Sequence, residues 1–158
     1  MQLDRTLIAA VEPTARFLKA LSHDDFVLHG SLRNFTIARP HLARGSIDWE
    51  HQNRCAVYAS IAVEFALIHA LIQEPSYRFD HELDKLMVHD EHIVVRSGFI
   101  HVLPGDRFEP VDDGAGGLWR LAYEPVEVLA TIEVIPELLA HFPFIAFKSH
   151  TLTKEARS

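Results

Sequence analysis

The sequence has one cysteine, Cys55, among its 158 residues, and it has no long uninterrupted apolar run. A single cysteine excludes an internal disulfide framework and a cysteine-based structural zinc site. Because no window of about 18 residues is uniformly apolar, we expect no transmembrane helix and no membrane partner. Residues 1–10 include Asp4 and lack the basic start of a signal peptide, so we expect a protein of the reducing cytoplasm.

Aspartate, glutamate and lysine are absent from residues 26–47, although the whole chain carries a net charge of −7. This stretch contains Arg33, Arg39 and Arg44, so it carries +3 and leaves −10 for the remainder. The acidic balance disfavours a general nucleic-acid-binding scaffold, which needs a basic face. A local cationic loop in an acidic protein is instead suited to hold an anion.

The chain also lacks repeats and low-complexity tracts, and its 7 glycines and 8 prolines are ordinary numbers. At about 100–200 residues per domain, we expect one domain over residues 1–150 and a polar C-terminal tail over residues 151–158. Strand-like runs dominate the second half, with few crossover helices between them. This order predicts an α+β fold with mixed or antiparallel sheets and not a doubly wound parallel sheet.

Hydrophobic periodicity and turn residues predict the individual elements. Residues 3–21 have a helical pattern that Pro13 interrupts, residues 61–72 form a central helix and residues 136–141 a short one. Strands are predicted at residues 26–29, 56–59, 85–89, 93–96, 99–103, 119–123, 126–134 and 142–147, with hairpin turns at residues 90–91 and 97–98. Residues 31–53 form a long connector, which in a compact domain is usually functional or partly structured.

Two short motifs are chemically informative. The first is His29-Gly30-Ser31 at a strand end, which offers an imidazole, a backbone open to close approach and a hydroxyl. The second is the strand-to-helix junction with Tyr58 and Ser60, where an aromatic ring and a hydroxyl lie beside free helix N–H groups. A planar ligand with polar or anionic groups suits such a combination.

Together these motifs resemble the His–Tyr–Glu branch of the ADP-ribosyltransferase fold, which includes poly-ADP-ribose polymerases and diphtheria-like toxins. The chain also resembles bacterial proteins of the same fold whose activity is uncertain. The resemblance covers residues 26–139 and is carried by the segments HGS, VYAS, AVEFALIHAL, GFIHVLPGDRF and PVEVLATIEVIPELL. It implies split mixed and antiparallel sheets with a few helices. It also implies an enzyme that binds nicotinamide adenine dinucleotide (NAD) as co-substrate, transfers its ADP-ribose and releases nicotinamide.

The resemblance implies a role for each motif residue. His29 would bond a ribose hydroxyl of the adenosine half, and the Gly30 backbone would hold the nicotinamide amide with Ser31 behind it. Tyr58 would stack on the nicotinamide ring, and Ser60 would line the same pocket. Charge, and not the resemblance, makes the three arginines of residues 26–47 candidates for the pyrophosphate.

The catalytic carboxylate is less well defined. A carboxylate near the ribose 2′-OH stabilises the positive charge that develops as the nicotinamide–ribose bond breaks. Glu127, at the start of the strand at residues 126–134, best matches the glutamate of the family, and Glu124 and Glu109 are alternatives. Pro125 stands where enzymes that modify arginine and some other side chains carry Glu or Gln, which is a departure from the pattern of the family.

Metal and cysteine chemistry are not expected. The eleven histidines include a group near acidic residues, but no His-Glu-x-x-His helix is present. The members of that group are His81, His89, Asp90, Glu91, His92 and His101. Cys55 opens an apolar strand, where a free cysteine usually serves packing.

Three functions stay open. The leading one is transfer of ADP-ribose from NAD to an unknown acceptor, which is a protein, a nucleic acid, a small molecule or water. An RNA 2′-phosphotransferase is the second, and its basic groove would come from residues 33–54. The third is an inactive toxin-like or antitoxin-like module that binds a protein partner through residues 141–147.

Overall fold

A computed structural model describes residues 11–21, 25–42, 55–73, 75, 77–80, 82–89, 94–111 and 118–147. Several parts of the sequence predictions fall outside these residues. They are the helical pattern before residue 11, Arg44, the turn at residues 90–91 and the tail at residues 151–158.

The described residues form two α-helices, two short 3₁₀ helices and twelve strands. In chain order they are α2 (Val11–Leu21), β1 (Phe26–Ser31), β2 (Ile37–Ala38), β3 (His41–Leu42), β4 (Cys55–Ser60), α3 (Val63–Leu71), β5 (Tyr77–Asp80), β6 (Lys85–Val88), β7 (Gly98–Pro104), η2 (Gly105–Arg107), β8 (Glu109–Pro110), β9 (Trp119–Ala122), β10 (Val126–Glu127), β11 (Ala130–Val134), η3 (Pro136–His141) and β12 (Ile145–Phe147).

The strands form one large sheet and two small ones. The large sheet has the order β11-β7-β1-β4-β9-β8, with β3 attached to β4, and all its pairs are antiparallel. A ribbon joins β2 to β10, and a third sheet has the order β12-β6-β5 with a parallel β12–β6 pair. The predicted α+β class with antiparallel sheets is therefore confirmed. Among the described residues, no helix combines the length and hydropathy needed to cross a bilayer.

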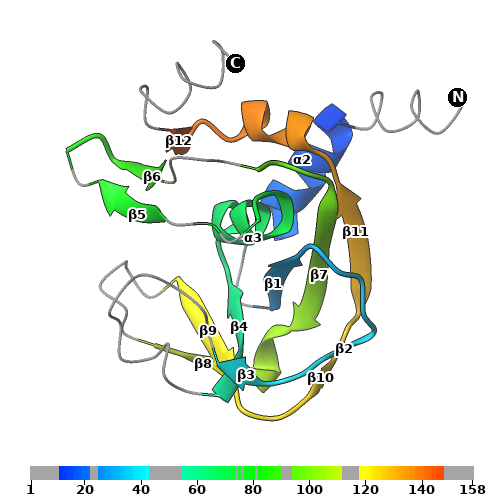
Figure 1. The fold of residues 1–158 in the computed structure, drawn as a ribbon. Helices are drawn as coiled ribbons and strands as arrows, with labels where there is room; N and C mark the ends of the chain where they lie inside the picture. Colours follow the sequence, from blue (N-terminus) through cyan, green and yellow to red (C-terminus); the bar gives the residue numbers. More distant parts are fainter. Residues whose placement is uncertain are drawn as a thin grey trace, which may run out of the picture.

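Helix α3 lies at the centre of the molecule, as its composition predicts (Figure 1). Seven of its nine residues are buried, because the large sheet covers one side while α2, η3 and the β12-β6-β5 sheet contribute the rest of the core around it. A helix that is apolar on nearly every side is stable only when it is covered in this way. The C-terminal run takes part in the same core, since Phe142 and Ile145 are buried there.

Two glycines let α3 lie directly on the large sheet. A Cβ atom on Gly30 of β1 would stand 1.8 Å from the carbonyl oxygen of Ala66, and one on Gly98 of β7 would stand 1.7 Å from that of Ala70. Residues four apart share one face of a helix, so α3 crosses the two neighbouring strands at these two points. Each glycine is therefore required by the close approach of two backbones.

This contact also decides where the neighbours of Gly30 point. Successive side chains of a strand alternate between its two faces, so His29 and Ser31 lie on the face opposite α3. A second buried cluster lies on that face and includes Val27 and Leu103 of the large sheet. Ala38 of β2 and Val126 of β10 belong to the same cluster, so the β2–β10 ribbon covers this face.

Two predicted hairpins are wrong. Strand β6 pairs with β5 and β12, and β7 pairs with β1 and β11, so the predicted turn regions do not join paired neighbours. Of the strand predicted at residues 93–96, the described part forms only one isolated bridge, between Val95 and Ile72. Strand β5 was not predicted. Local turn residues favour hairpins, but burial of the apolar strand faces against α3 outweighs that preference.

The long strand predicted at residues 126–134 is also wrong, because it is two strands in different sheets. Val128 donates its N–H to the carbonyl of Thr36, whereas Leu129 donates to the carbonyl of Val102 on β7. The chain thus changes partner between these two residues. Glu127 belongs to the two-residue strand β10 and not to the strand β11 of the large sheet.

Substitution of Gly30 by alanine should destabilise the protein by about 3 kcal/mol or more, because the new methyl group meets helix backbone that cannot rotate away. Ser97→Ala, at an exposed position beside Gly98, is the matched control and should change stability by less than about 0.5 kcal/mol. Urea denaturation followed by circular dichroism measures both. Equal stability of the two variants would show that α3 does not lie on β1 as described.

Candidate functional site

The large sheet divides between β1 and β4. Six residue pairs join β1 to β7 and four join β4 to β9, but Leu28 and Ser60 are the one pair of the described residues that joins β1 to β4. Beyond that pair, β3 takes the place of β1 beside β4, with His41 opposite Ala56. The end of β1, which carries His29 to Ser31, is therefore parted from β4.

His29 spans the point of separation. Its Nδ1 lies 2.6 Å from the carbonyl oxygen of Tyr58 on β4. A carbonyl only accepts hydrogen bonds, so Nδ1 carries the proton and donates, and Nε2 of the neutral ring is left as an acceptor. Burial lowers the pKa of His29 to about 4, and the Tyr58 carbonyl raises it in part. The nearby His101 and His41 lower it further. His29 is thus neutral at pH 7, with a fixed tautomer.

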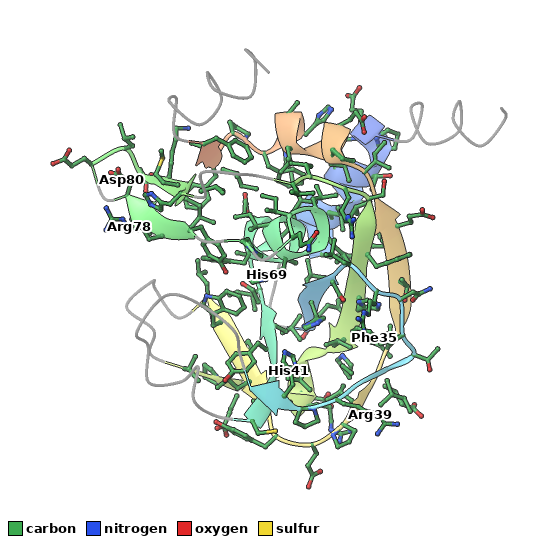
Figure 2. The ribbon with its side chains drawn as sticks, in the orientation of Figure 1. Phe35, Arg39, His41, His69, Arg78 and Asp80 are labelled. Atoms are coloured by element: carbon green, nitrogen blue, oxygen red, sulfur yellow. The ribbon has the colours of Figure 1, made fainter. Side chains whose placement is uncertain are left out.

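Three further rings surround His29. The ring centroids of Phe35, His101 and His41 lie 5.6, 6.1 and 6.4 Å from that of His29. We call His29, Phe35, His41 and His101 the histidine cluster. Figure 2 shows Phe35 and His41 in the lower half of the molecule, on the segment that follows β1. His41 also meets the ring of Tyr58 at 6.0 Å, so residues from β1, β3, β4 and β7 converge here.

His101 is the deepest member of the histidine cluster. It lies opposite His29 on β7 and is 0% exposed. The ring of Phe35 stacks on it at 3.8 Å with an angle of 11°, and the Phe35 N–H donates to its Nε2 at 3.4 Å. Burial lowers the pKa of His101, and the backbone of His29 raises it in part. From the sequence, His101 was a candidate for metal binding alone. A histidine inside the apolar run Gly98–Pro104 nevertheless indicates a buried polar group.

Tyr58 contacts this cluster from β4, through its carbonyl and its ring, whereas the contacts of Ser60 are with the turn before α3, and both lie in closed surroundings. Tyr58 is 8% exposed and packs with Leu121 and Val111. Ser60 is 1% exposed, and its hydroxyl donates to the carbonyl of Leu118 and accepts from the N–H of Ala62. The hydroxyl of Ser60 therefore holds the strand-to-helix turn. Ser60 is not the N-cap of α3, because the helix begins at Val63 after an Ala62 cap.

The cationic candidates lie on the segment that joins β1 to β3. Arg33 and Arg39 are exposed, and Figure 2 shows Arg39 at the lower end of the molecule. The Arg39 carbonyl lies 3.3 Å from Nδ1 of His41. The hydroxyl of Ser31 accepts a hydrogen bond from the N–H of Arg33 at 3.0 Å, which shapes the turn after β1. Residues 26–47 contain no aspartate or glutamate, so neither arginine has an acidic partner within its own segment.

The three candidate glutamates do not join the histidine cluster. Glu109, Glu124 and Glu127 are all exposed. Glu127 lies opposite Ile37 in the β2–β10 ribbon, and its neighbour Val126 is buried against the sheet. Alternation along the strand therefore directs Glu127 away from the face that carries His29.

A second aromatic group, formed by side chains of α3, β5 and β9, was not foreseen from the sequence. Nε2 of His69 and the hydroxyl of Tyr77 share a hydrogen bond of 2.8 Å, and Trp119 and Phe65 pack around them. Burial lowers the pKa of His69 to about 4, with a smaller contribution from His29, and burial raises the pKa of Tyr77. The group joins α3 to β5 and β9. A polar residue inside the otherwise apolar helix was the available signal.

No group of three or more His, Cys, Asp or Glu side chains within the described parts of the chain is arranged to hold a metal ion. His81, Asp90, Glu91 and His92 lie outside those parts. The expectation that Cys55 is packed is wrong, because Cys55 is exposed at the start of β4.

Comparison with known proteins adds no relative. No protein-family model matches the chain, and neither a curated protein nor a solved structure matches it significantly. The function must therefore be inferred from the site itself.

The two most perturbed histidines make stability depend on pH. Their pKa values are about 4 in the folded protein and near 6.5 in the unfolded chain, so the unfolded chain binds more protons as the pH falls from 6.5 to 4. The free energy of unfolding should fall by about 2 kcal/mol for each group between pH 7 and pH 5. Urea denaturation at a series of pH values measures this loss. The His29→Asn variant, which keeps an N–H donor, should lose its share of the slope, and an unchanged slope would contradict the assignment.

Proposed function

We propose that this protein binds NAD at the separation of β1 from β4 and transfers its ADP-ribose, with nicotinamide as the leaving group. The observation that carries the proposal is the contact between His29 and Tyr58. These residues are 29 positions apart, and the hydrogen bond from His29 to the Tyr58 carbonyl brings them together. They are the histidine and the tyrosine of the two motifs that resemble the His–Tyr–Glu branch of ADP-ribosyltransferases.

The chemistry of the site suits the ligand. Neutral His29 presents Nε2 as an acceptor, which fits a ribose hydroxyl as donor. Beyond Leu28, β1 has no ladder partner on its β4 side among the described residues, which leaves the Gly30 region for an amide group. Arg33 and Arg39 are exposed on the segment between β1 and β3, where they supply positive charge for a pyrophosphate.

The division of the large sheet supports the fold that the resemblance implies. A split antiparallel sheet with one central helix is the arrangement expected for an ADP-ribosyltransferase-like domain. Here β11-β7-β1 and β4-β9-β8 meet at a single residue pair, and α3 follows β4 directly. The proposed fold and the proposed function therefore both depend on the point at which β1 separates from β4.

The exposed glutamates favour a second candidate, a binding module of the same fold that holds NAD without cleaving it. Cleavage needs a carboxylate beside the ribose, and Glu127 points away from His29 in this structure. The two candidates share the binding site and differ only in nicotinamide release.

Titration with NAD should raise the melting temperature of the protein. At about 100 times the dissociation constant, a ligand adds about 2.7 kcal/mol, which is roughly 5–10 °C for a chain of this size. His29→Asn keeps the donor to the Tyr58 carbonyl but removes the Nε2 acceptor, so it should fold and lose most of the shift. Differential scanning fluorimetry measures the shift. His141→Asn, on η3 beside α2, is the matched control and should behave as wild type.

Nicotinamide release, followed by chromatography, then separates transferase from binding module. A shift without release supports the binding module. Absence of any shift in wild type, with the control folded, would remove NAD from the proposal altogether.

Removal of the two arginines should weaken binding of the pyrophosphate. Arg33→Gln together with Arg39→Gln should reduce NAD affinity about 10-fold or more, and the remaining affinity should depend less on salt. Arg78→Gln is the matched control, since Arg78 is an exposed arginine on β5 at the other end of the molecule (Figure 2). Isothermal titration at two salt concentrations measures both. Equal losses of NAD affinity in the double variant and the control would show that these arginines act only through the net charge of the protein and not through local contact with the pyrophosphate.

A further inference from the structure

We propose that Phe35 is a gate, whose ring fills the place on His101 where the flat heteroaromatic base of a nucleotide stacks once residues 32–36 move aside. The nature of the ligand rests on the proposed function, but the gate itself does not. Phe35 precedes β2 on the segment that covers the face of the large sheet opposite α3.

The ring of Phe35 sits on His101 as a flat ligand would. The two rings are 3.8 Å apart and nearly parallel, at 11°. By contrast, the rings that contact His29, which are Phe35, His41 and His101, are tilted or edge-on to it, with angles of 48° to 85° between the ring planes. Parallel stacking at this distance is the geometry in which proteins hold heteroaromatic bases. His101 therefore offers one face of its ring as a stacking surface for a flat ligand, and in this structure the ring of Phe35 occupies that surface.

The backbone around Phe35 is held by few contacts. Arg33 and Asn34 are exposed, and the Arg33 N–H donates to the side chain of Ser31 within the same turn. The Phe35 N–H donates to Nε2 of His101 at 3.4 Å, which is long for a hydrogen bond. Thr36 is tied to another element by one backbone hydrogen bond, from the N–H of Val128 to its carbonyl, and opening of the gate breaks this bond. The ring of Phe35 is thus the main anchor of residues 32–36.

Closure leaves a polar atom without a partner. Nδ1 of His101 is buried and makes no hydrogen bond, although the backbone of His29 is close enough to affect its pKa. An unsatisfied buried donor or acceptor costs stability, and this cost opposes the gain from stacking. When the gate opens, the Phe35 N–H bond to Nε2 breaks, and water or the edge of a base can then meet both ring nitrogens. The closed state is thus held by one ring stack and one long hydrogen bond, against the cost of the unsatisfied Nδ1.

The first arm of the test needs no ligand. Diethyl pyrocarbonate modifies accessible imidazoles, and mass spectrometry reports each histidine separately. In wild type, His101 should react slowly, and in Phe35→Ala it should react at least 10-fold faster. Phe108→Ala, which truncates another partly buried ring of the same core cluster, is the matched control and should leave His101 protected. Protection of His101 in a folded Phe35→Ala variant would overturn the gate.

A disulfide staple keeps the test decisive if Phe35→Ala does not fold. Thr36→Cys with Val128→Cys, in a Cys55→Ser background, joins two residues that the Val128 N–H to Thr36 carbonyl hydrogen bond holds opposite each other. The oxidised staple should protect His101 at least 10-fold better than the reduced form. It should also slow association with NAD and with AMP at least 10-fold, and a reductant should restore both.

The outcomes separate the gate from the proposed function. Equal His101 modification in the oxidised and reduced forms overturns the gate, even where NAD binds. If His101 modification follows the staple but neither NAD nor AMP binds any variant, the nucleotide site and the proposed function both fail while the movement of Phe35 stands. Binding of NAD or AMP that follows the staple supports the whole inference.

Discussion

The contact of α3 with two glycines is the constraint on which the rest of the structure depends. Gly30 and Gly98 bring β1 and β7 against the carbonyl oxygens of Ala66 and Ala70, a distance at which no side chain fits. A helix so apolar needs cover on every side, and this approach provides it along two strands at once. The same contact fixes the orientation of β1, because Gly30 faces the helix and His29 must then face away. The place of the imidazole in the site follows from the packing of the core.

The separation of β1 from β4 explains why an imidazole bonds a backbone carbonyl. When two strands part, the polar groups along their facing edges lose the ladder that would satisfy them, and buried carbonyls need other partners. Nδ1 of His29 supplies one for Tyr58. Burial holds His29 neutral, so the bond also fixes which ring nitrogen remains an acceptor. One side chain thus closes the sheet on one side and offers a recognition atom on the other.

The sequence was informative where local pattern and tertiary packing agree, and misleading where they compete. Helix α3 and strands β1 and β4 were predicted because their apolar runs are continuous and end at clear breakers. The partners of β6 and β7 were not, since partner choice depends on which faces α3 covers. The break between Val128 and Leu129 has no local signal either, as each residue simply bonds a different distant carbonyl. The same holds for the site: His29 and Tyr58 stand in recognisable motifs, whereas the stack of Phe35 on His101 joins residues 66 positions apart.

The remaining chemical question concerns the carboxylate, and the fold links it to the gate. Glu127 belongs to the ribbon in which β10 pairs with β2, and β2 follows Phe35 after a single residue. In the closed arrangement, Ala38 of β2 and Val126 of β10 are buried against the large sheet, which keeps Glu127 on the outer side of the ribbon. A movement that carries Phe35 off His101 while the Thr36–Val128 bond holds must displace β10 as well, because the ribbon moves as one unit. Cleavage by Glu127 would therefore require the larger movement, in which the ribbon turns and its buried side is re-covered by ligand. Binding of a base requires only the smaller movement of residues 32–36, which breaks the Thr36–Val128 bond and leaves β10 in place. Binding and cleavage therefore make different demands on the same segment.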